Sequence, residues 1–386
     1  MLKRDKKSNI SKILHALWIH KNASRVQISR AIGLDKSTVT NIINEMIDIG
    51  LISVVAEGDS GPQGGRKPVL LKINPGFGYV VGAEIQPELC RMVVSDLDGT
   101  ISDYGEYVFD SLTDFNELFV KGICPFITNQ QFSGKKILGL GIGLPGVVDP
   151  YRSMLMQSIP LGISETMQLP GFDEFAEIMG GFTAPIIYEN DANCCAWGEL
   201  ALGRSDGIRN FITILIEFTD VSHPSYKTHA IALGVGIVID GRVYHGKNYS
   251  SGEFRSLFWN EGNRTQFSLS GDDVDLIKSD VDVQRRFLEE LASHVAFLVN
   301  MFNLSYVFFG GDAVMFEESL PQIVSDAINK NWPYRNSVDC QISFLNRGKD
   351  AVSYGAASLV LNSIFLDYPI VSHEGMMLPA GTDFIY

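Results

Sequence analysis

The segment Ser24–Asp48 constrains the fold of this chain most tightly, because its pattern fits two short helices joined by a tight turn. Gly33 can adopt the positive φ that closes such a turn, and Asp35 or Ser37 can cap the next helix. The buried stripe of that helix consists of Val39, Ile42, Ile43 and Met46. Its outer face carries Lys36, Ser37, Thr38, Thr40, Asn41 and Asn44. Such a face can reach base edges and phosphates in a major groove, although an ordinary helical hairpin fits the same pattern.

The residues after the helix pair favour DNA binding over an ordinary hairpin. A strand follows Gly50, and a second strand at Val69–Ile73 comes after a Gly-rich loop that carries Arg66 and Lys67. Two strands with a basic tip form a wing, and an Arg that enters a narrow minor groove reads DNA shape. A solvated turn is the alternative for the loop alone. We therefore predict a winged helix-turn-helix domain over residues 1–75, bound to double-stranded DNA.

The distribution of charge agrees with a DNA-binding head on a different kind of body. Residues 1–72 contain 12 Lys and Arg against 6 Asp and Glu, whereas the whole chain has a net charge of −14. A basic segment gains affinity for DNA by releasing counterions, and an acidic body is repelled by phosphates.

Length and composition indicate several globular domains in a cytoplasmic protein. The chain has 386 residues, of which 45% are hydrophobic, and this size favours two or three domains. No apolar run approaches the roughly 20 residues of a membrane helix, and the N-terminus does not have the pattern of a signal peptide. The five cysteines are scattered without a CxxC pair, which favours reduced thiols and disfavours a cysteine-based zinc site.

The remainder of the chain predicts two similar α/β lobes. Hairpin strands, a helix and a further strand follow one another between residues 79 and 143, and the same order recurs after Asn210. Another strand at Pro185–Tyr188 precedes a helix expected from about Cys194. We place the first lobe at residues 76–190 and the second at residues 191–386.

Taken together, these features resemble the ROK family, which contains bacterial sugar kinases and sugar-responsive transcriptional repressors on an actin-like ATPase (ribonuclease H-like) fold. The repressors carry an N-terminal winged helix-turn-helix, as predicted here. The resemblance covers nearly the whole chain and rests on the order and spacing of six short motifs: Gly64–Pro68 (GGRKP), Gly141–Gly146, Glu189–Asn193, Ile239–Tyr244, Gly252-Glu253 and Gly310-Gly311.

The resemblance also implies a sugar site. In the kinases of the family, the Asp that matches Asp191 is the general base that takes a proton from the sugar hydroxyl. The residues that match Asn190 and Glu253 hydrogen-bond sugar hydroxyls. Gly143, Pro145 and Gly146 would close over the sugar, and Ser256 stands where the family has a His that ligates zinc and touches the sugar. The alternatives are that Asp191 only caps a helix and that Gly143–Gly146 is a simple turn.

Three departures from the family pattern argue against catalysis. The phosphate loop Asp-x-Gly-Gly-Thr is replaced by Glu84–Glu88, which lacks both glycines and contains Pro87, a residue without an N–H. Asp220–His229 interrupts the second phosphate hairpin. The zinc-binding His is Ser256, and the cysteine cluster has no counterpart in Leu257–Ser270. We therefore expect no zinc, no other cofactor and no catalytic residue. Arg255 could replace the lost His or form an internal ion pair, and scattered histidines such as His245 are more often structural than metal ligands.

The sequence therefore predicts a sugar-responsive transcriptional regulator, a repressor by family resemblance. It would bind operator DNA and a carbohydrate effector as a homodimer or higher homo-oligomer. A sugar kinase that transfers phosphate from ATP to a hexose is the first alternative, with Asp191 as its base. A DNA-binding protein with an inactive scaffold as its body is the second.

Overall fold

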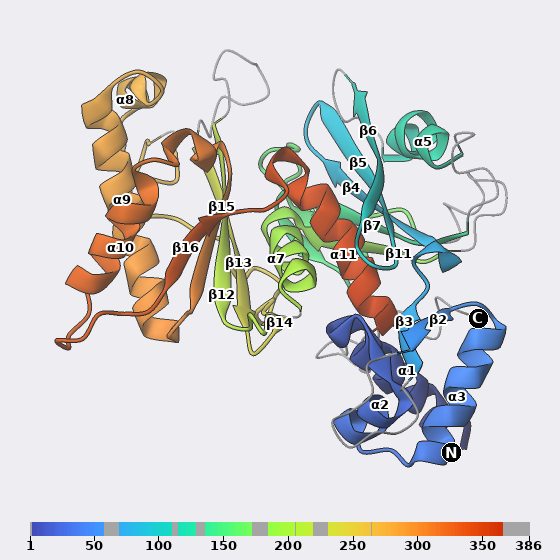
Figure 1. The fold of residues 1–386 in the computed structure, drawn as a ribbon. Coiled ribbons are helices and arrows are strands. Elements are labelled where there is room, and N and C mark those ends of the chain that lie inside the picture. The colour runs from blue at the N-terminus through green and yellow to red at the C-terminus, as the bar shows by residue number, and fades with distance from the viewer. Residues whose placement is uncertain are drawn as a thin grey trace.

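Two five-stranded sheets with the same strand order form the body of the protein (Figure 1). The computed structural model describes residues 2–57, 69–109, 115–128, 136–171, 184–204, 206–218, 231–263 and 265–365. The first sheet has the order β11-β7-β4-β5-β6 and is built from β4 (Tyr79–Ile85), β5 (Leu89–Asp96), β6 (Ile101–Val108), β7 (Ile137–Leu144) and β11 (Ile186–Asn190). The second, read from its other edge, has the matching order β16-β15-β12-β13-β14, with β12 (Phe211–Phe218), β13 (Ile231–Ile239), β14 (Arg242–Val243), β15 (Tyr306–Gly311) and β16 (Gln341–Phe344).

The pairing within each sheet determines which loops meet. In the first sheet, β4, β7 and β11 are parallel, whereas β5 and β6 are antiparallel additions. The second sheet repeats this arrangement with β12, β15 and β16 as its parallel strands. Because the carboxyl ends of parallel strands lie at one edge, the β4–β5 turn, the end of β7 and the end of β11 come together there. The prediction of two similar α/β halves is confirmed by this topology.

Two helices lie between the sheets (Figure 1). α7 (Asp191–Leu202) packs against β12 and β13, α11 (Ala351–Phe365) packs against β4 and β7, and the two helices pack on each other. Glycines permit this close approach, since a Cβ on Gly82 would lie 1.9 Å from the carbonyl oxygen of Ser353. A Cβ on Gly355 would lie 1.8 Å from the carbonyl oxygen of Cys194. α11 therefore returns the end of the described chain to the first sheet.

The outer face of each sheet is covered by its own helices. Side chains that alternate along a strand face opposite layers, and Val81 accordingly joins the cluster beneath the outer helices, whereas Val80 faces the central layer. The first sheet is covered by α4 (Phe115–Leu118), the π-helical segment η2 (Phe119–Ile123) and α5 (Cys124–Thr128). The second is covered by α9 (Val281–Phe302) and α10 (Leu320–Lys330), with α8 (Gly271–Leu276) beside α9. A small sheet contains β8 (Val147–Asp149), β9 (Met154–Gln157) and β10 (Met167–Gln168).

In its described residues, the N-terminal head has three α-helices and a three-stranded sheet of order β1-β3-β2. Its elements are α1 (Leu2–His20), β1 (Ala23–Ser24), α2 (Arg25–Ile32), α3 (Lys36–Asp48), β2 (Ile52–Glu57) and β3 (Val69–Ile73). The predicted helix pair is present: Gly33 has a φ of 70°, and the Asp35 side chain caps α3 by accepting a hydrogen bond from the Thr38 N–H at 2.9 Å. Arg66 and Lys67, the predicted tip of the wing, lie outside the described residues.

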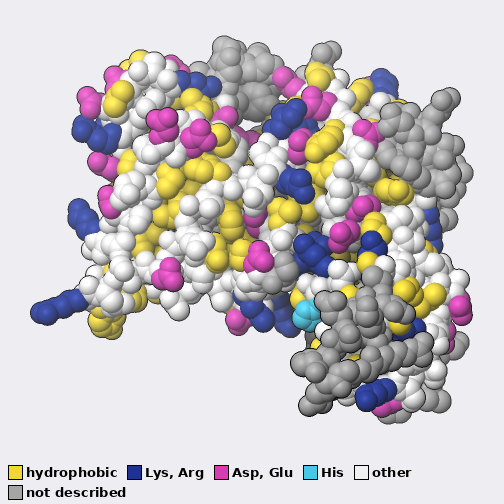
Figure 2. Space-filling view, viewed as in Figure 1, with side chains coloured by type: hydrophobic (Ala, Val, Ile, Leu, Met, Phe, Trp, Pro, Cys, Tyr) yellow, Lys and Arg dark blue, Asp and Glu magenta, His cyan; other side chains and the backbone are white. Residues whose placement is uncertain are grey.

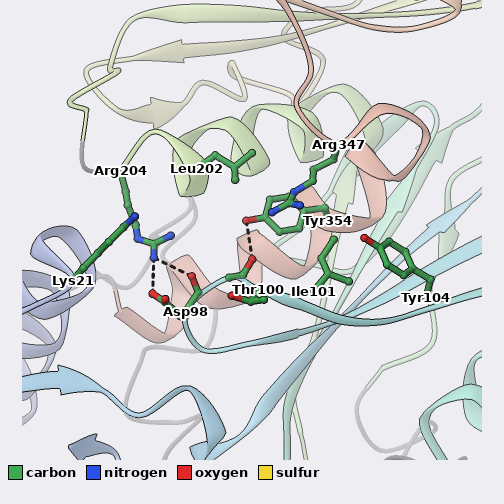
Figure 3. A pocket seen from close by; sticks show the side chains of 10 residues that line it. Lys21, Asp98, Thr100, Ile101, Tyr104, Leu202, Arg204, Arg347 and Tyr354 are labelled. Carbon is green, nitrogen blue, oxygen red and sulfur yellow. Dashed lines mark hydrogen bonds and ion pairs between the residues drawn. The ribbon is translucent and has the colours of Figure 1, made fainter. Parts of the chain in front are cut away.

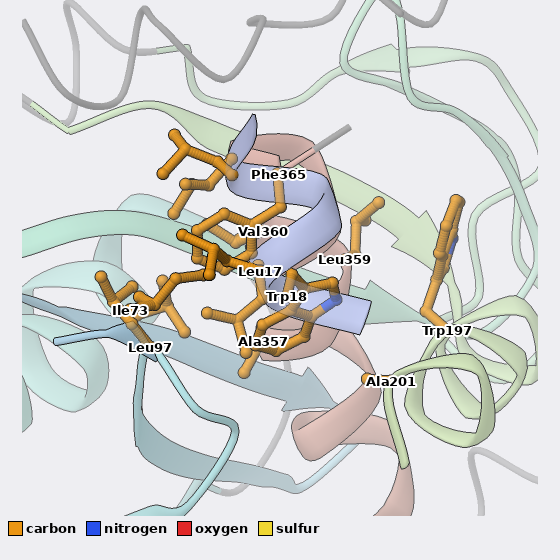
Figure 4. Close-up of a cluster of buried hydrophobic side chains, with 14 of the residues drawn as sticks. Leu17, Trp18, Ile73, Leu97, Trp197, Ala201, Ala357, Leu359, Val360 and Phe365 are labelled. Atoms are coloured by element: carbon orange, nitrogen blue, oxygen red, sulfur yellow. The ribbon is translucent and has the colours of Figure 1, made fainter. Parts of the chain in front are cut away.

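One hydrophobic cluster joins the head to the body. Trp18 of α1 stacks on Phe365 of α11 with ring centroids 4.7 Å apart. Around this pair, Leu17 and Ile73 of the head pack with Leu97 and Val360 of the body (Figure 4). The buried apolar core of the head is therefore continuous with the layer that holds α7 and α11.

Two further features of the described residues are the distribution of surface charge and the polarity of the helices. Lys and Arg side chains are interspersed with Asp and Glu over the face of the body shown in Figure 2. Among the described helices, none combines the length and apolar character needed to cross a membrane.

Candidate functional site

The corner between β11 and α7 (Glu189–Asn193) arranges the polar residues that the sequence singled out. Asn190 is the N-cap of α7, and its Oδ1 accepts a hydrogen bond from the Asn193 N–H at 3.0 Å. The Asn190 amide also donates to the carbonyl oxygen of Gly146 at 3.0 Å and to Asp191 Oδ1 at 2.9 Å. α7 therefore begins at Asp191 and not near Cys194, because a capping side chain is already available at Asn190. The cap is Asn190, so Asp191 remains available to face the adjoining space.

Glu189 holds this corner from beneath. Its side chain is 1% exposed and accepts hydrogen bonds from the Asn190 N–H at 2.9 Å, the Asn193 amide at 3.1 Å and the Trp197 indole at 3.3 Å. His245 Nε2 lies 2.7 Å from Glu189 Oε2. Burial opposes ionisation of both groups, but their mutual attraction prevails, so the pKa of Glu189 is lowered and the pKa of His245 is raised. The two residues thus form a buried ion pair, which explains His245 without a metal.

Asp191 faces a cavity of about 360 Å³, here called the corner cavity. Its Oδ1 accepts hydrogen bonds from the Ala192 N–H at 2.7 Å and from Asn190. Burial raises the pKa of Asp191 well above its usual range, and the nearby carboxylates of Glu217, Glu84 and Glu253 raise it further. A carboxyl in this setting can accept or donate a hydrogen bond to a ligand hydroxyl.

The corner cavity brings together five of the seven predicted sugar-site residues: Pro145, Gly146, Asn190, Asp191 and Glu253. Gly143 does not line it, because a Cβ there would lie 2.6 Å from Val352 Cγ1, under α11. Ser256 is also elsewhere: it is 5% exposed, and its Oγ lies 2.9 Å from His294 Nε2. Gly143 thus serves helix packing, and Ser256 belongs to a small buried network.

Several lining residues were not predicted as ligands. Gln266 donates to the carbonyl oxygens of Leu233 at 3.2 Å and Phe254 at 2.6 Å, which holds a loop against β13 at the cavity wall. Glu217 lines the cavity from the end of β12. Arg255 also lines it, and its guanidinium stacks on Trp259 with 4.3 Å between Arg255 Cζ and the ring centroid. No local motif marks Glu217 or Gln266, because they reach the cavity only through the packing of distant segments. Arg255 does follow the Gly252-Glu253 motif, and the sequence left open whether it contacts a ligand or forms an internal ion pair.

Glu84, near the end of β4, places a buried acid beside the β4–β5 turn, where the sequence analysis expects a phosphate loop to be lost. Glu84 is 4% exposed, and burial, followed by repulsion from Glu217, raises its pKa to about 8. Gln86 donates to Glu84 Oε1 at 2.7 Å and to Glu217 Oε1 at 3.2 Å. The Gln86 N–H is engaged by the carbonyl oxygen of Leu89 at 2.8 Å, and Pro87 has none. The turn therefore offers carboxyls where phosphate capture needs N–H donors.

The other two expected departures from the family pattern, in the second phosphate hairpin and in the zinc site, are covered only in part by the described residues. The Asp220–His229 insertion, with His223 and His229, falls between β12 and β13 and lies entirely outside the described residues. In the described part, no group of three or more His, Cys, Asp and Glu side chains is placed to hold a metal ion. The absence of zinc stays a prediction.

The outer face of α3 has the exposure that contact with DNA requires. Lys36, Ser37, Asn41 and Asn44 are exposed, and Thr38 and Thr40 are half-buried. The Asn44 Oδ1 accepts a hydrogen bond from Arg25 Nη2 at 2.9 Å, which adds a cation from α2 to this face. The opposite stripe of Val39, Ile42, Ile43 and Met46 is buried as predicted.

A polar contact between head and body lies at the far end of α7, at Arg204, whose pairing with Asp98 is drawn in Figure 3. Arg204 Cζ lies 3.8 Å from the centroid of the Trp18 ring, and the Arg204 side chain donates to the carbonyl oxygen of Trp18 at 3.0 Å. It also pairs with Asp98 Oδ1 at 2.8 Å. Arg204, Asp98, Lys21 and Arg347 line a separate cavity of about 320 Å³ between head and body. α7 therefore connects the corner cavity, at its first residue, with the head, just beyond its last.

The amino-acid sequence of this chain is similar to those of known proteins. The sequence model of the ROK family matches residues 81–255. The xylose repressor of Bacillus spizizenii is 27% identical over 283 residues, 71% of this chain and 68% of that protein. The xylose repressor of Caldicellulosiruptor bescii is 24% identical over 92% of this chain and 96% of its own. That of Staphylococcus xylosus is 29% identical over 64% of this chain, but the aligned part spans only 59% of that repressor.

Solved structures have the same fold. A ROK family transcriptional regulator, a homologue of the E. coli MLC protein, superimposes with a TM-score of 0.71 at 19% identity, covering 93% of this chain and 97% of its own. A ROK family glucokinase from Streptomyces griseus, bound to glucose and AMPPNP, has a TM-score of 0.51 at 21% identity and covers 73% of this chain and 99% of its own. In its duplicated sheets and in the sequence of residues 81–255, the chain is therefore similar to proteins of the ROK family.

Proposed function

We propose that this protein is a sugar-responsive transcriptional repressor. Its head would bind operator DNA, and the corner cavity would bind a carbohydrate effector. The observation that carries the proposal is the placement of α7, which starts at Asp191 in the cavity wall and is followed by Arg204, which contacts Trp18 of the head. A ligand that moves the start of α7 has a direct mechanical route to the DNA-binding surface.

The domain assignment that accompanies this proposal has three parts. Residues 1–75 form a winged helix-turn-helix domain, residues 76–190 the first lobe and residues 191–386 the second. The packing of α11 on the first sheet joins the lobes. α3 would enter the major groove with Lys36, Ser37, Thr38, Thr40, Asn41 and Asn44, while Arg66 and Lys67 would contact the minor groove.

One recognition helix reads only a half-site, so a homodimer on a palindromic operator follows from the proposal. A repressor of this kind works in the cytoplasm, where its DNA is. The curated relatives named above are xylose repressors, and a sugar with several hydroxyls suits the acceptors in the corner cavity.

The carbohydrate would bind through Asp191, Glu253 and the backbone at Pro145 and Gly146, all of which line one cavity. The role of Asn190 is narrower than that of a free ligand. Both hydrogens of its amide are used within the corner, on Gly146 and Asp191, so it fixes the positions of these two groups. Its Oδ1 retains one lone pair beside the bond from Asn193.

A sugar kinase is the second candidate, favoured only by the position of Asp191 and by kinase relatives of the same fold. The β4–β5 turn argues against it, because Glu84 adds a buried carboxyl and Pro87 removes a donor. We therefore propose a protein without catalytic activity and without a bound metal or cofactor.

The test is a DNA-binding assay with the region upstream of the protein's own gene, with and without a panel of sugars. We expect binding that weakens with salt and is released by one class of sugar. Asn41→Ala should weaken operator binding by about 1–3 kcal/mol, and the Arg66→Ala/Lys67→Ala variant should lose its preference for A/T-rich flanks. Asn331→Ala, exposed at the end of α10, is the control.

Two results would overturn the proposal. Unchanged operator affinity in both head variants would remove the DNA-contact assignment. Sugar-dependent release of ADP from ATP-magnesium that disappears in Asp191→Asn would show that the protein is a kinase.

A further inference from the structure

A second cavity opens beside the corner cavity, and the two share a wall. This acid-lined cavity has a volume of about 580 Å³. Five residues line both cavities: Ile159, Pro160, Leu215, Glu217 and Ala232. Each volume falls within the range of ligand pockets, roughly 300–1,000 Å³, so the two together exceed what one monosaccharide requires.

The polar lining of the acid-lined cavity does not suit a phosphate. Among the described residues, the two cations that line it are already engaged by the same carboxylate, since Lys349 Nζ lies 2.9 Å and Arg91 Nε 3.4 Å from Glu106 Oε1. Glu84, Glu217 and Asp312 contribute three carboxyl groups to the lining. Burial raises the pKa values of Glu84 and Glu217, so these groups repel a triphosphate where they are ionised and offer it no positive charge where they are neutral.

The same lining suits hydroxyl groups. Glu84 is 4% exposed, and its Oε2 accepts no hydrogen bond among the described residues; the nearest cation, Arg91 Nη1, is 3.6 Å away. A buried acceptor without a donor costs free energy that a ligand O–H would recover. Pro87, Pro160 and Phe218 give apolar surface beside these acceptors, and the C–H faces of a sugar ring pack well on such surface.

We propose that the effector is a di- or oligosaccharide that occupies both cavities, with one sugar unit at Asp191 and the next at Glu84. This inference rests on the proposed function, because it deepens the assignment of the corner cavity to a carbohydrate. The acid-lined cavity then contributes to specificity by distinguishing a glycoside from a free monosaccharide.

The experiment compares binding of D-xylose with xylobiose, and of D-glucose with cellobiose and maltose, by calorimetry on the full-length protein. At least one disaccharide should bind on the order of tenfold more tightly than its monosaccharide. Val314→Trp should abolish this difference by filling the acid-lined cavity, because Val314 lines only that cavity and is 44% exposed, so the fold tolerates the change. Val281→Trp, at a 75% exposed position that lines neither cavity, is the matched control.

The possible outcomes distinguish failure of the oligosaccharide inference from failure of the proposed sugar site. Monosaccharides that bind through Asp191 as well as the disaccharides do, with no effect of Val314→Trp, would overturn the inference and leave the sugar site intact. Binding of ATP-magnesium that Val314→Trp abolishes would also overturn it. If none of the saccharides binds, or if Asp191→Asn binds them as the wild type does, the assignment of the corner cavity itself fails.

Discussion

Two loops at the same edge of the first sheet have opposite chemistry. In the β11–α7 corner, Glu189 accepts three hydrogen bonds and pairs with His245. In the β4–β5 turn, Glu84 keeps an oxygen without a hydrogen bond among the described residues, and its pKa is raised to about 8. The first loop is a satisfied network that fixes the geometry of a ligand site, whereas the second is an unsatisfied acid that disfavours phosphate. This contrast agrees with the proposal that the corner binds a carbohydrate and that the protein does not use a nucleotide.

The largest effect should come from removing the acid that holds the β11–α7 corner. Glu189→Ala leaves the charged His245 and three donors buried without a partner, which typically costs about 3–5 kcal/mol. Urea denaturation followed by fluorescence measures the change. Glu261→Ala, at an exposed position, should shift stability by less than about 0.5 kcal/mol. A loss below about 1 kcal/mol at Glu189 would contradict the description of the corner as a rigid network.

The ionisation of Glu84, beside the β4–β5 turn, should lower the free energy of unfolding as pH rises. A carboxylate in an ordinary ion pair has the opposite effect. The unfolded chain releases the Glu84 proton near the ordinary glutamate pKa of 4.5, while the folded protein keeps it until about pH 8. Stability contributed by the protonated group is therefore complete below about pH 4.5 and is lost as pH rises through 8. Glu84→Gln removes this loss, so we expect the variant to be more stable than wild type at pH 8 by on the order of 2–4 kcal/mol.

The measurement is chemical denaturation of wild type and Glu84→Gln at pH 5 and pH 8. In Glu84→Gln, the free energy of unfolding should fall less steeply with pH than in wild type. The dependence should not vanish, because burial also raises the pKa values of Asp191 and Glu217. Glu165→Gln changes an exposed acid and should leave the slope as it is. An unchanged slope in Glu84→Gln would show that this carboxyl ionises normally in the folded protein.

The difference between the two loops also separates what the sequence could predict from what it could not. The alternation of apolar residues is enough to predict most strands of the two large sheets, and the Glu189–Asn193 motif is enough to predict the β11–α7 corner, whereas the role of Asp191 stays a prediction. The sequence pattern did not predict α11. This helix is buried between α7 and the first sheet and is therefore apolar on every side, so it lacks the periodicity that marks a surface helix. α1 does have such periodicity, since Ile10, Ile13, Leu14 and Leu17 are buried, and it could have been found.

Contacts between distant segments were beyond sequence reasoning. Arg204 reaches the carbonyl oxygen of Trp18, 186 residues away, and Gln266 reaches the cavity from a loop without a motif. Gly143 was assigned to the sugar because it lies in a glycine-rich motif, yet its missing Cβ makes room for α11. A motif shows which backbone is tightly constrained, but only packing shows whether the constraint comes from a ligand or from a neighbouring helix.

The proposed role of the β11–α7 corner in sugar binding can be tested by substituting Asp191. In Asp191→Asn, the amide oxygen of the new side chain can still accept the hydrogen bonds from Ala192 and Asn190, but an NH₂ group would face the cavity in place of an acceptor. We expect this variant to lose about 1–3 kcal/mol of sugar affinity while operator binding without sugar stays intact. Calorimetry with the effector sugar measures this change, and Asp240→Asn, at an exposed turn, is the control. Equal affinities for sugar in Asp191→Asn and wild type would remove Asp191 from the site.

The smallest effect concerns the communication between the corner and the head. Arg204→Lys keeps the positive charge near Asp98 but loses the stacking on Trp18 and the geometry that joins Trp18, Ala201 and Asp98. If the start of α7 moves on binding sugar, the head follows through this contact. We expect sugar affinity and operator affinity to change little separately, while the free energy that couples them falls by about 0.5–2 kcal/mol.

Operator titrations with and without sugar give this coupling free energy for each variant. Arg285→Lys is the matched control, because Arg285 makes an exposed ion pair with Asp282 on α9, away from the head. A coupling free energy in Arg204→Lys equal to that of wild type would exclude the route through α7. The remaining route would be α11, which begins beside the acid-lined cavity at Ala351 and ends where Phe365 stacks on Trp18. The signal would then originate at the β4–β5 side of the body, and the acid-lined cavity would be the one that controls DNA binding.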